Sequence, residues 1–265
     1  MTDDFTQNRS DKLVAVYQRF RDTIDATAPG GKSMPYHWWT LPNPLGAIWM
    51  PYRSMLGEYA TELANIINDL TNHVDRLRAW DKIISQLDND EKFAVSHEFL
   101  NTLGTVALGQ PYAIKSRFAF ASGHLCHQAN QARQSKVWVD DFPEQNLYLN
   151  DIQPYGAGWR KFSAFKVRVE AIGGSAFKAA SDDFRNAYNH GFSSRFVLGI
   201  TSTVQRTVKD GKVRYVFGGN EPLSISKVAL LLEIERDLCY VAFYAFIKLV
   251  AEQTAAITSF DEKHS

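Results

Sequence analysis

The sequence is poor in cysteine, carries no excess of charge of either sign and lacks a long apolar run. Its 265 residues include two cysteines, and 29 basic residues balance 29 acidic ones. Two cysteines exclude a scaffold that depends on several disulfides. The zero net charge argues against a protein that coats nucleic acid with its whole surface, although a local basic patch is compatible with it.

The chain also lacks the features that direct a protein to a membrane or through one. Its most apolar stretch, residues 238–251, is too short to span a bilayer and contains Lys248, so it predicts a central core helix. The first twelve residues are polar and acidic, unlike a secretory signal peptide. Cys126 and Cys239 lie among apolar residues, which favours buried reduced thiols. We therefore expect a cytoplasmic protein without a membrane segment.

Helical periodicity dominates the rest of the sequence and predicts a mostly α fold in one domain, residues 1–265. Apolar side chains recur every three or four residues, and the expected helices cover residues 11–26, 52–87, 91–107, 109–133, 159–172, 175–190 and 224–257. Residues 34–52 hold four prolines and three of the six tryptophans, so we expect an extended strap there. Residues 134–158 show little periodicity and predict a loop.

One segment, residues 196–217, alternates between apolar and polar side chains around Asp210-Gly211 and predicts a β-hairpin. A two-residue turn would place on one face Gln205, Thr207, Lys209, Lys212 and Arg214. The hairpin has one acid, Asp210, against four cations, Arg206, Lys209, Lys212 and Arg214. Such a ribbon can hold an RNA backbone, and an ordinary solvated hairpin face is the alternative.

Two short motifs suggest other chemistry, but their context argues against it. Residues 26–33, ATAPGGKS, fit a loose phosphate-loop pattern, yet a charged helix precedes them and the proline-rich strap follows. Residues 124–128, HLCHQ, offer two histidines and a cysteine without a second cluster at ligand spacing. We expect neither a nucleotide cofactor nor a metal.

The stretch DDFRNAYNHGF, residues 182–192, combines residue types that suit RNA cleavage without a metal. On one continuous helix, Asp182, Asn186 and His190 would form a polar column beside Arg185. Histidine can move a proton to or from a ribose or leaving-group oxygen. Arginine can hold the phosphate and stabilise its transition-state charge, and asparagine can orient an oxygen.

Through Arg185, Asn186 and His190 the sequence resembles the HEPN family (higher eukaryotes and prokaryotes nucleotide-binding domains), whose mark is an arginine, a polar residue, a short spacer and a histidine. The resemblance implies a helical bundle over residues 159–258, with the hairpin inserted and with additional helices before it in residues 11–133. A second pair, Arg117 and His124, has Phe118 after the arginine and fits less well.

The resemblance implies a metal-independent endoribonuclease that acts as a toxin or phage-defence effector. It also implies that the protein forms a homodimer, as family members usually do, and that an antitoxin or regulatory protein is a further partner. Some family members only bind, so a non-catalytic RNA-binding or protein-interaction scaffold is the main alternative. A small-molecule pocket lined by the tryptophans of residues 34–52 is a third interpretation. The sequence does not identify the RNA substrate.

Overall fold

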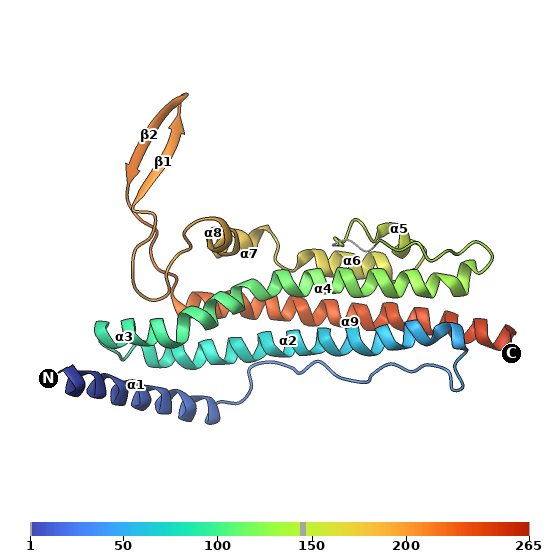
Figure 1. Cartoon of the computed structure of the whole chain (residues 1–265), viewed down its shortest axis with the longest axis horizontal. Helices are drawn as coiled ribbons and strands as arrows, with labels where there is room; N and C mark the ends of the chain where they lie inside the picture. Colours follow the sequence, from blue (N-terminus) through green and yellow to red (C-terminus); the bar gives the residue numbers. More distant parts are fainter. Residues whose placement is uncertain (1, 144–146, 265) are drawn as a thin grey trace. The chain divides into compact units, whose positions relative to one another are not determined.

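The computed structural model describes residues 2–143 and 147–264, and these residues are mostly helical, as predicted (Figure 1). The first part of the chain contains α1 (Thr2–Asp25), a 3₁₀ turn (Ala47–Trp49), α2 (Met50–Ile84), α3 (Asn89–Val95), a π turn (Ser96–Leu100) and α4 (Asn101–Gln134). The second part contains α5 (Gln153–Gly156), α6 (Phe162–Ala171), α7 (Ser175–Ala180), α8 (Phe184–His190), β1 (Val204–Lys209), β2 (Lys212–Phe217) and α9 (Ile225–His264). In the described residues, β1 and β2 form a single antiparallel sheet.

The chain forms two compact units, each assembled from three separate segments. Unit 1 comprises the segments ending at residue 31, 70–109 and 175–234. Unit 2 comprises 32–69, 110–174 and the segment from 235 onward. Unit 1 therefore contains the Arg-Asn-x-x-x-His motif and the hairpin, and unit 2 contains the tryptophan-rich strap. Among the described residues, no helix is both long and apolar enough to cross a membrane.

The core of unit 1 is built on stacked aromatic rings. Trp80 of α2 stacks on Phe20 of α1, with ring centres 4.4 Å apart, and on Phe99, 5.2 Å away. Trp80 and Phe20 are buried, and burial of each such ring contributes about 2–3 kcal/mol. Asp88 and Glu91 form the reciprocal capping box that starts α3.

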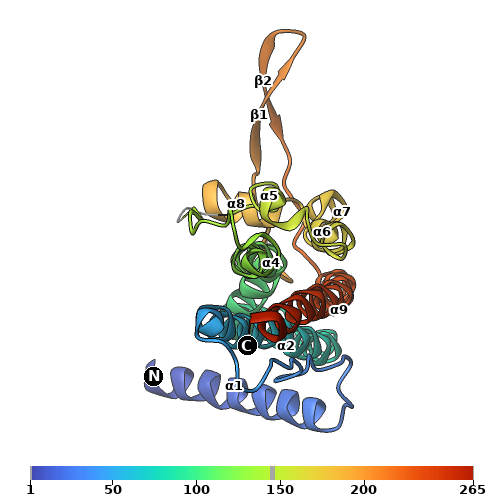
Figure 2. The ribbon, with the colours of Figure 1, turned by 90° about the vertical axis from the view of Figure 1, so that its right-hand side faces the viewer.

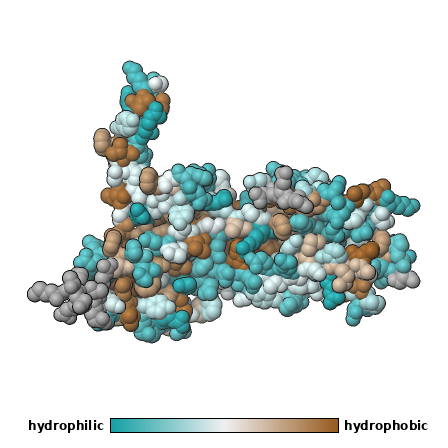
Figure 3. Space-filling model, in the orientation of Figure 1, coloured by the Kyte–Doolittle hydropathy of each residue, from teal (hydrophilic) through white to brown (hydrophobic). Residues whose placement is uncertain are grey.

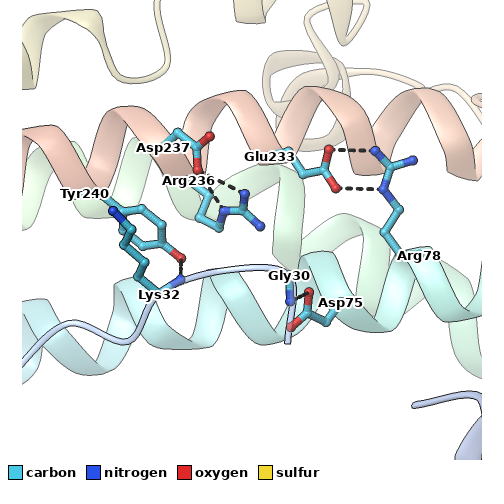
Figure 4. A network of polar contacts seen from close by, with 8 residues as sticks. All are labelled: Gly30, Lys32, Asp75, Arg78, Glu233, Arg236, Asp237 and Tyr240. Carbon is cyan, nitrogen blue, oxygen red and sulfur yellow. Dashed lines mark hydrogen bonds and ion pairs between the residues drawn. The ribbon is translucent and has the colours of Figure 1, made fainter. Parts of the chain in front are cut away.

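A bidentate ion pair between Arg78 and Glu233 joins α2 to α9 within unit 1 (Figure 4). Arg78 Nε and Nη2 donate to the two carboxylate oxygens of Glu233 at 2.7 and 2.6 Å. This hydrogen bonding raises the pKa of the Arg78 guanidinium above its ordinary value. Both side chains are partly exposed, so solvent screens the pair and its main effect is to fix the register of the two helices.

In unit 2, residues 34–46 of the proline-rich segment form no regular helix or strand, as the composition predicted, but residues 47–52 are helical, which corrects the strap expected over 34–52. Trp49 is fully buried and its Nε1 donates to Asp261 of α9 at 2.7 Å. Deeper inside, Tyr52 donates to Gln253 Oε1 at 2.9 Å, and Gln253 Nε2 donates to Cys126 Sγ at 3.1 Å. Cys126 and Cys239 are both buried and unbonded to each other, and burial raises the pKa of both thiols.

The helices differ from the sequence prediction at several boundaries: α1 begins at Thr2 instead of residue 11, α9 continues to His264 instead of ending at 257, and two predicted helices break at other places. The predicted break near residue 108 is wrong, because α4 continues through Pro111 to Gln134. Proline lacks the amide that would bond back one turn, a loss of about 3 kcal/mol. Buried Leu108 and Ile114 continue the apolar stripe on either side and offset that loss. The expected helix 175–190 is also broken, into α7 and α8. The predicted loop 134–158 contains the short α5, and its residues 144–146 lie outside the described residues.

Candidate functional site

The motif lies on α8, a helix of seven residues that a left-handed turn separates from α7. Asp182 and Asp183 have φ angles of 53° and 48°. Ser181 Oγ donates to Phe177 O at 2.8 Å, and the Asp183 amide donates to Lys178 O at 2.8 Å, so these bonds end α7. The predicted column from Asp182 through the motif is therefore wrong. Aspartate tolerates the left-handed conformation better than most residues, and local bonding outweighs helix continuation.

Phe184 anchors α8 to the rest of unit 1. It is buried and packs against buried Phe196, with ring centres 5.4 Å apart. Phe196 in turn sits over Gly104 of α4, where an added Cβ would come within 2.6–2.7 Å of the ring. Ser96 Oγ donates to the Phe196 carbonyl at 3.1 Å. The segment that follows α8 is thus fixed at Phe196, and α8 is held from its buried side.

Arg185, Asn186 and His190 of α8 are all exposed to solvent. Because an α-helix turns by about 100° per residue, Asn186 and His190 lie roughly 40° apart around its axis, but Arg185 and His190 lie roughly 140° apart. The three predicted residues are therefore all exposed on one short helix. Asn186 and His190 share a side of it, whereas Arg185 leaves the helix in a different direction. Gly191 follows His190 and caps the C-terminal end of α8.

The hairpin forms around Asp210 and Gly211, both with positive φ, as predicted. In its register Thr207 lies opposite Arg214, and Lys209 lies opposite Lys212. This confirms the shared face expected from the two-residue turn. Arg206 is opposite Tyr215 and lies on the other face. Figures 1 and 2 show the hairpin extending away from α7 and α8 of its own unit.

Sequence reasoning missed the character of that second hairpin face. Apart from Arg206, it consists of Val204, Val208, Val213, Tyr215 and Phe217. All five are exposed. The signal was present in the sequence, because these positions have the same parity when counted outward from the Asp210-Gly211 turn. We name this set, with Arg206, the apolar hairpin face, and the set around Lys209 and Lys212 the basic hairpin face.

The phosphate-loop pattern does not fold as a phosphate loop (Figure 4). In unit 1 the Gly30 amide donates to Asp75 Oδ1 at 3.1 Å. In unit 2 the Lys32 amide donates to the Tyr240 hydroxyl at 3.1 Å. The Gly30 amide already donates to the Asp75 carboxylate, whose negative charge would repel a phosphate group. Neither amide lies at a strand-to-helix junction, which phosphate binding of this kind requires.

The histidines and cysteine of residues 124–128 have separate structural partners in unit 2. His127 is buried and its Nε2 lies 2.8 Å from Asp140 Oδ1. Burial lowers the pKa of His124, which packs between Phe120 and Phe142. Cys126 bonds Gln253. In residues 2–143 and 147–264, no group of three or more histidine, cysteine, aspartate or glutamate side chains is arranged to hold a metal ion.

Unit 2 also contains an open groove of about 540 Å³ between α2 and α4. Its walls include Tyr59 and Phe120, and Arg117 pairs with Glu62 there. Burial raises the pKa of the Tyr59 hydroxyl. No tryptophan of residues 34–52 lines this groove. The third interpretation, a pocket built from those tryptophans, therefore gains no support from it.

Comparison with known proteins identifies no relative of this chain. No family model matches the sequence, and no curated protein or solved structure matches it.

Proposed function

We propose that this protein is a metal-independent endoribonuclease of the HEPN type. The observation that carries the proposal is the exposure of Arg185, Asn186 and His190 together on α8. Phe184 anchors this helix on its buried side, so its exposed polar side chains lie where a large substrate can reach them. These residue types supply a phosphate ligand, an orienting amide and a proton-transfer group, which are what transesterification of RNA needs.

In the proposed reaction His190 takes the proton from a ribose 2′-hydroxyl or gives one to the leaving 5′ oxygen. The 2′ oxygen forms a bond to the adjacent phosphorus as the bond from phosphorus to the 5′ oxygen breaks, which leaves a cyclic phosphate and a 5′-hydroxyl. Arg185 binds the phosphate oxygens, on which negative charge increases. Asn186 orients a phosphate or sugar oxygen beside His190. The reaction needs no redox partner and no metal ion.

The basic hairpin face supports an RNA-binding role for the same unit. Lys209 and Lys212 lie directly opposite each other, and like charges in that arrangement destabilise an isolated hairpin. A phosphate group between them would remove the repulsion. Arg214 extends the same face, and Arg206 adds a cation on the other one. We assign Lys209, Lys212 and Arg214, which share one face, to contacts with the RNA backbone, and Arg206 on the opposite face is not part of this set.

The proposal also covers the oligomeric state of the protein and its biological role. Because Arg185 and His190 leave α8 about 140° apart, two copies related by a two-fold axis can combine the arginine of one with the histidine of the other. We therefore propose a homodimer whose two motifs line one groove. The biological role that fits is that of a cytoplasmic RNA-cutting toxin or phage-defence effector, controlled by an antitoxin or regulatory protein.

Cleavage of labelled single-stranded RNA by the purified full-length protein tests the proposal. We expect His190→Ala and Arg185→Ala each to reduce the rate by at least ~100-fold, the usual effect of losing a proton-transfer or phosphate group. A suitable control is His97→Ala, because His97 is an exposed histidine of the same unit outside the motif. Cleavage that disappears with a chelator, or that survives both motif substitutions, would refute the assignment.

Arg185 and His190 leave α8 about 140° apart, so within one copy they do not point at the same phosphate. This geometry favours one alternative, a non-catalytic RNA-binding or protein-interaction scaffold. In that case the protein binds RNA through the hairpin but leaves it intact. Binding without cleavage, unchanged by His190→Ala and Arg185→Ala, would select this alternative.

A further inference from the structure

The hairpin exposes hydrophobic side chains to an extent that a free hairpin does not tolerate well. Phe217 is 81 % exposed, Tyr215 62 % and Val208 61 %. In residues 204–217 every side chain is exposed except Thr207, which is half-buried. Figure 3 shows hydrophobic residues among hydrophilic ones along this projection. A two-stranded hairpin is at best marginally stable in water, and a sheet normally packs its apolar face against something.

The distribution of charge indicates what can cover this face. Lys209, Lys212 and Arg214 lie on the basic hairpin face, whereas the apolar hairpin face carries the single charge of Arg206. Two sheets pack about 10 Å apart, so two apolar faces in contact would keep the lysines of each copy on opposite outer sides, farther apart than the ~8 Å screening length. Self-association through the apolar face thus avoids most of the like-charge repulsion.

The one charged residue of the apolar face also suits a two-fold contact. Arg206 and Tyr215 are cross-strand neighbours on that face. In a two-fold symmetric contact, if Arg206 of one copy touches Tyr215 of the other, the reverse contact forms as well. Each Arg206 can therefore lie over the Tyr215 ring of the other copy. Such a contact between a guanidinium and an aromatic ring is favourable, and two of them form at once.

The hairpin cannot form the whole interface. Six residues per strand span about 20 Å and two strands about 10 Å, a footprint on the order of 200 Å² per copy. A standard interface buries ~800 Å² per partner. Further apolar surface is exposed next to it in unit 1, where Phe192 is 83 % and Ile200 62 % exposed. These residues lie between α8 and β1 in the chain.

We propose that the apolar hairpin face is an interface between two copies of this chain, in which the hairpins pack face to face. The inference gives the homodimer of the proposed function a specific contact surface. It does not depend on RNA cleavage, since a scaffold with this hairpin would associate in the same way.

Two valines of β2 provide a matched test. Val213 lies on the apolar face and is 48 % exposed, and Val216 lies on the basic face and is 51 % exposed. Sedimentation velocity of the wild-type protein from ~1 to ~100 µM should show a dimer that dissociates on dilution. We expect Val213→Asp to raise the dissociation constant by at least ~10-fold, because it places a carboxylate in the contact. Val216→Asp should change it less than ~2-fold, because the same charge stays in solvent.

The melting temperatures of both variants at monomeric concentration should equal that of the wild type, because neither valine is buried in one copy. A wild type that stays monomeric throughout, a Val213→Asp protein that still dimerises, or equal dissociation of both variants would overturn the proposal. Equal dissociation would indicate edge-to-edge strand pairing instead.

Val213→Asp could weaken the dimer by unfolding the hairpin locally, so a second measurement uses the wild-type protein without substitutions. Amide hydrogen exchange in residues 204–217 of the wild type should be slower at dimeric than at monomeric concentration. Exchange that is independent of concentration would contradict the proposal, as would slower exchange that appears only when an acidic protein or RNA is added.

Discussion

Asp182 and Asp183 are consecutive residues in the left-handed conformation, and together they separate α7 from α8. Lys178 Nζ lies 3.2 Å from Asp183 Oδ2, which ties the turn back to α7. The direction in which α8 presents Arg185 and His190 is therefore set by this turn and by Phe184, and not by a continuous helix from Ser175.

The turn predicts opposite responses to two substitutions of Asp182, which is exposed. Asp182→Gly should leave the free energy of unfolding within ~0.5 kcal/mol of the wild type, because glycine adopts a positive φ without steric cost. Asp182→Val should lower it by about 1–2 kcal/mol, because a β-branched side chain clashes there. Urea denaturation measures both. In a continuous helix the order would be reversed, with glycine the worse of the two.

This turn marks the limit of what the sequence could predict at the site. The sequence predicted most of the helices, the strap over residues 34–46 and the hairpin, because their patterns are local and extend over many residues. At residues 181–183 helical spacing continues in the sequence, but a few side-chain and backbone bonds end the helix. Pro111 is the opposite case, since a local break signal is overridden by burial of the residues around it.

Arg185, Asn186 and His190 could be named as candidate site residues from the sequence because their pattern is also local. Arg185, Asn186 and His190 form a compact motif, and their exposure follows from the buried position of Phe184 beside them. How an arginine and a histidine on different sides of a helix meet one phosphate depends on a second molecule or a bound RNA. A pattern within one chain cannot specify that arrangement.

The basic hairpin face predicts a salt-dependent contribution to RNA binding. Lys209→Glu with Lys212→Glu should weaken binding of single-stranded RNA at low salt and reduce the slope of log affinity against log salt by roughly one to two, about 0.7 for each phosphate contact. Lys227→Glu is the control, because Lys227 is exposed in unit 1 near the start of α9. Fluorescence anisotropy at several salt concentrations measures the slope. Equal loss in the control would show a general charge effect.

Glu235 of unit 2 predicts a pH dependence of stability. Its carboxylate is buried and accepts the Gly173 amide at 2.7 Å. Burial raises the pKa of Glu235 above its ordinary value, although the Gly173 bond and Lys115 oppose the shift. A raised carboxyl pKa means that folding favours the protonated form. The contribution of Glu235 to stability is therefore greatest below its unfolded pKa and falls as the pH rises through its folded pKa.

Glu235→Gln keeps an acceptor for Gly173 and removes the charge. The melting temperature of this variant relative to the wild type should therefore increase from about pH 4 to about pH 8. Glu58→Gln, a substitution at an exposed carboxylate of the same unit, should show no comparable trend. A Glu235→Gln protein that becomes relatively less stable as the pH rises would mean that the ionised carboxylate is the form that folding prefers.

The divergence of Arg185 and His190 around α8 makes a prediction about mixed dimers. If each catalytic site combines Arg185 of one copy with His190 of the other, Arg185→Ala and His190→Ala proteins are each inactive alone. In a mixed dimer the first variant supplies an intact histidine and the second an intact arginine, so one complete site forms. Random mixing makes half of the dimers mixed, each with one of two sites, so about a quarter of the wild-type rate should return.

Mixing the two purified variants, allowing subunits to exchange and then measuring RNA cleavage tests this. A control mixture of Arg185→Ala with Arg185→Ala/His190→Ala cannot form a complete site in either arrangement and should stay inactive. If both catalytic groups come from one copy, the first mixture also stays inactive although each single variant dimerises. That result would require Arg185 to reach the His190 side of its own helix, and it would remove the geometric reason for a dimeric site while leaving the hairpin interface untouched.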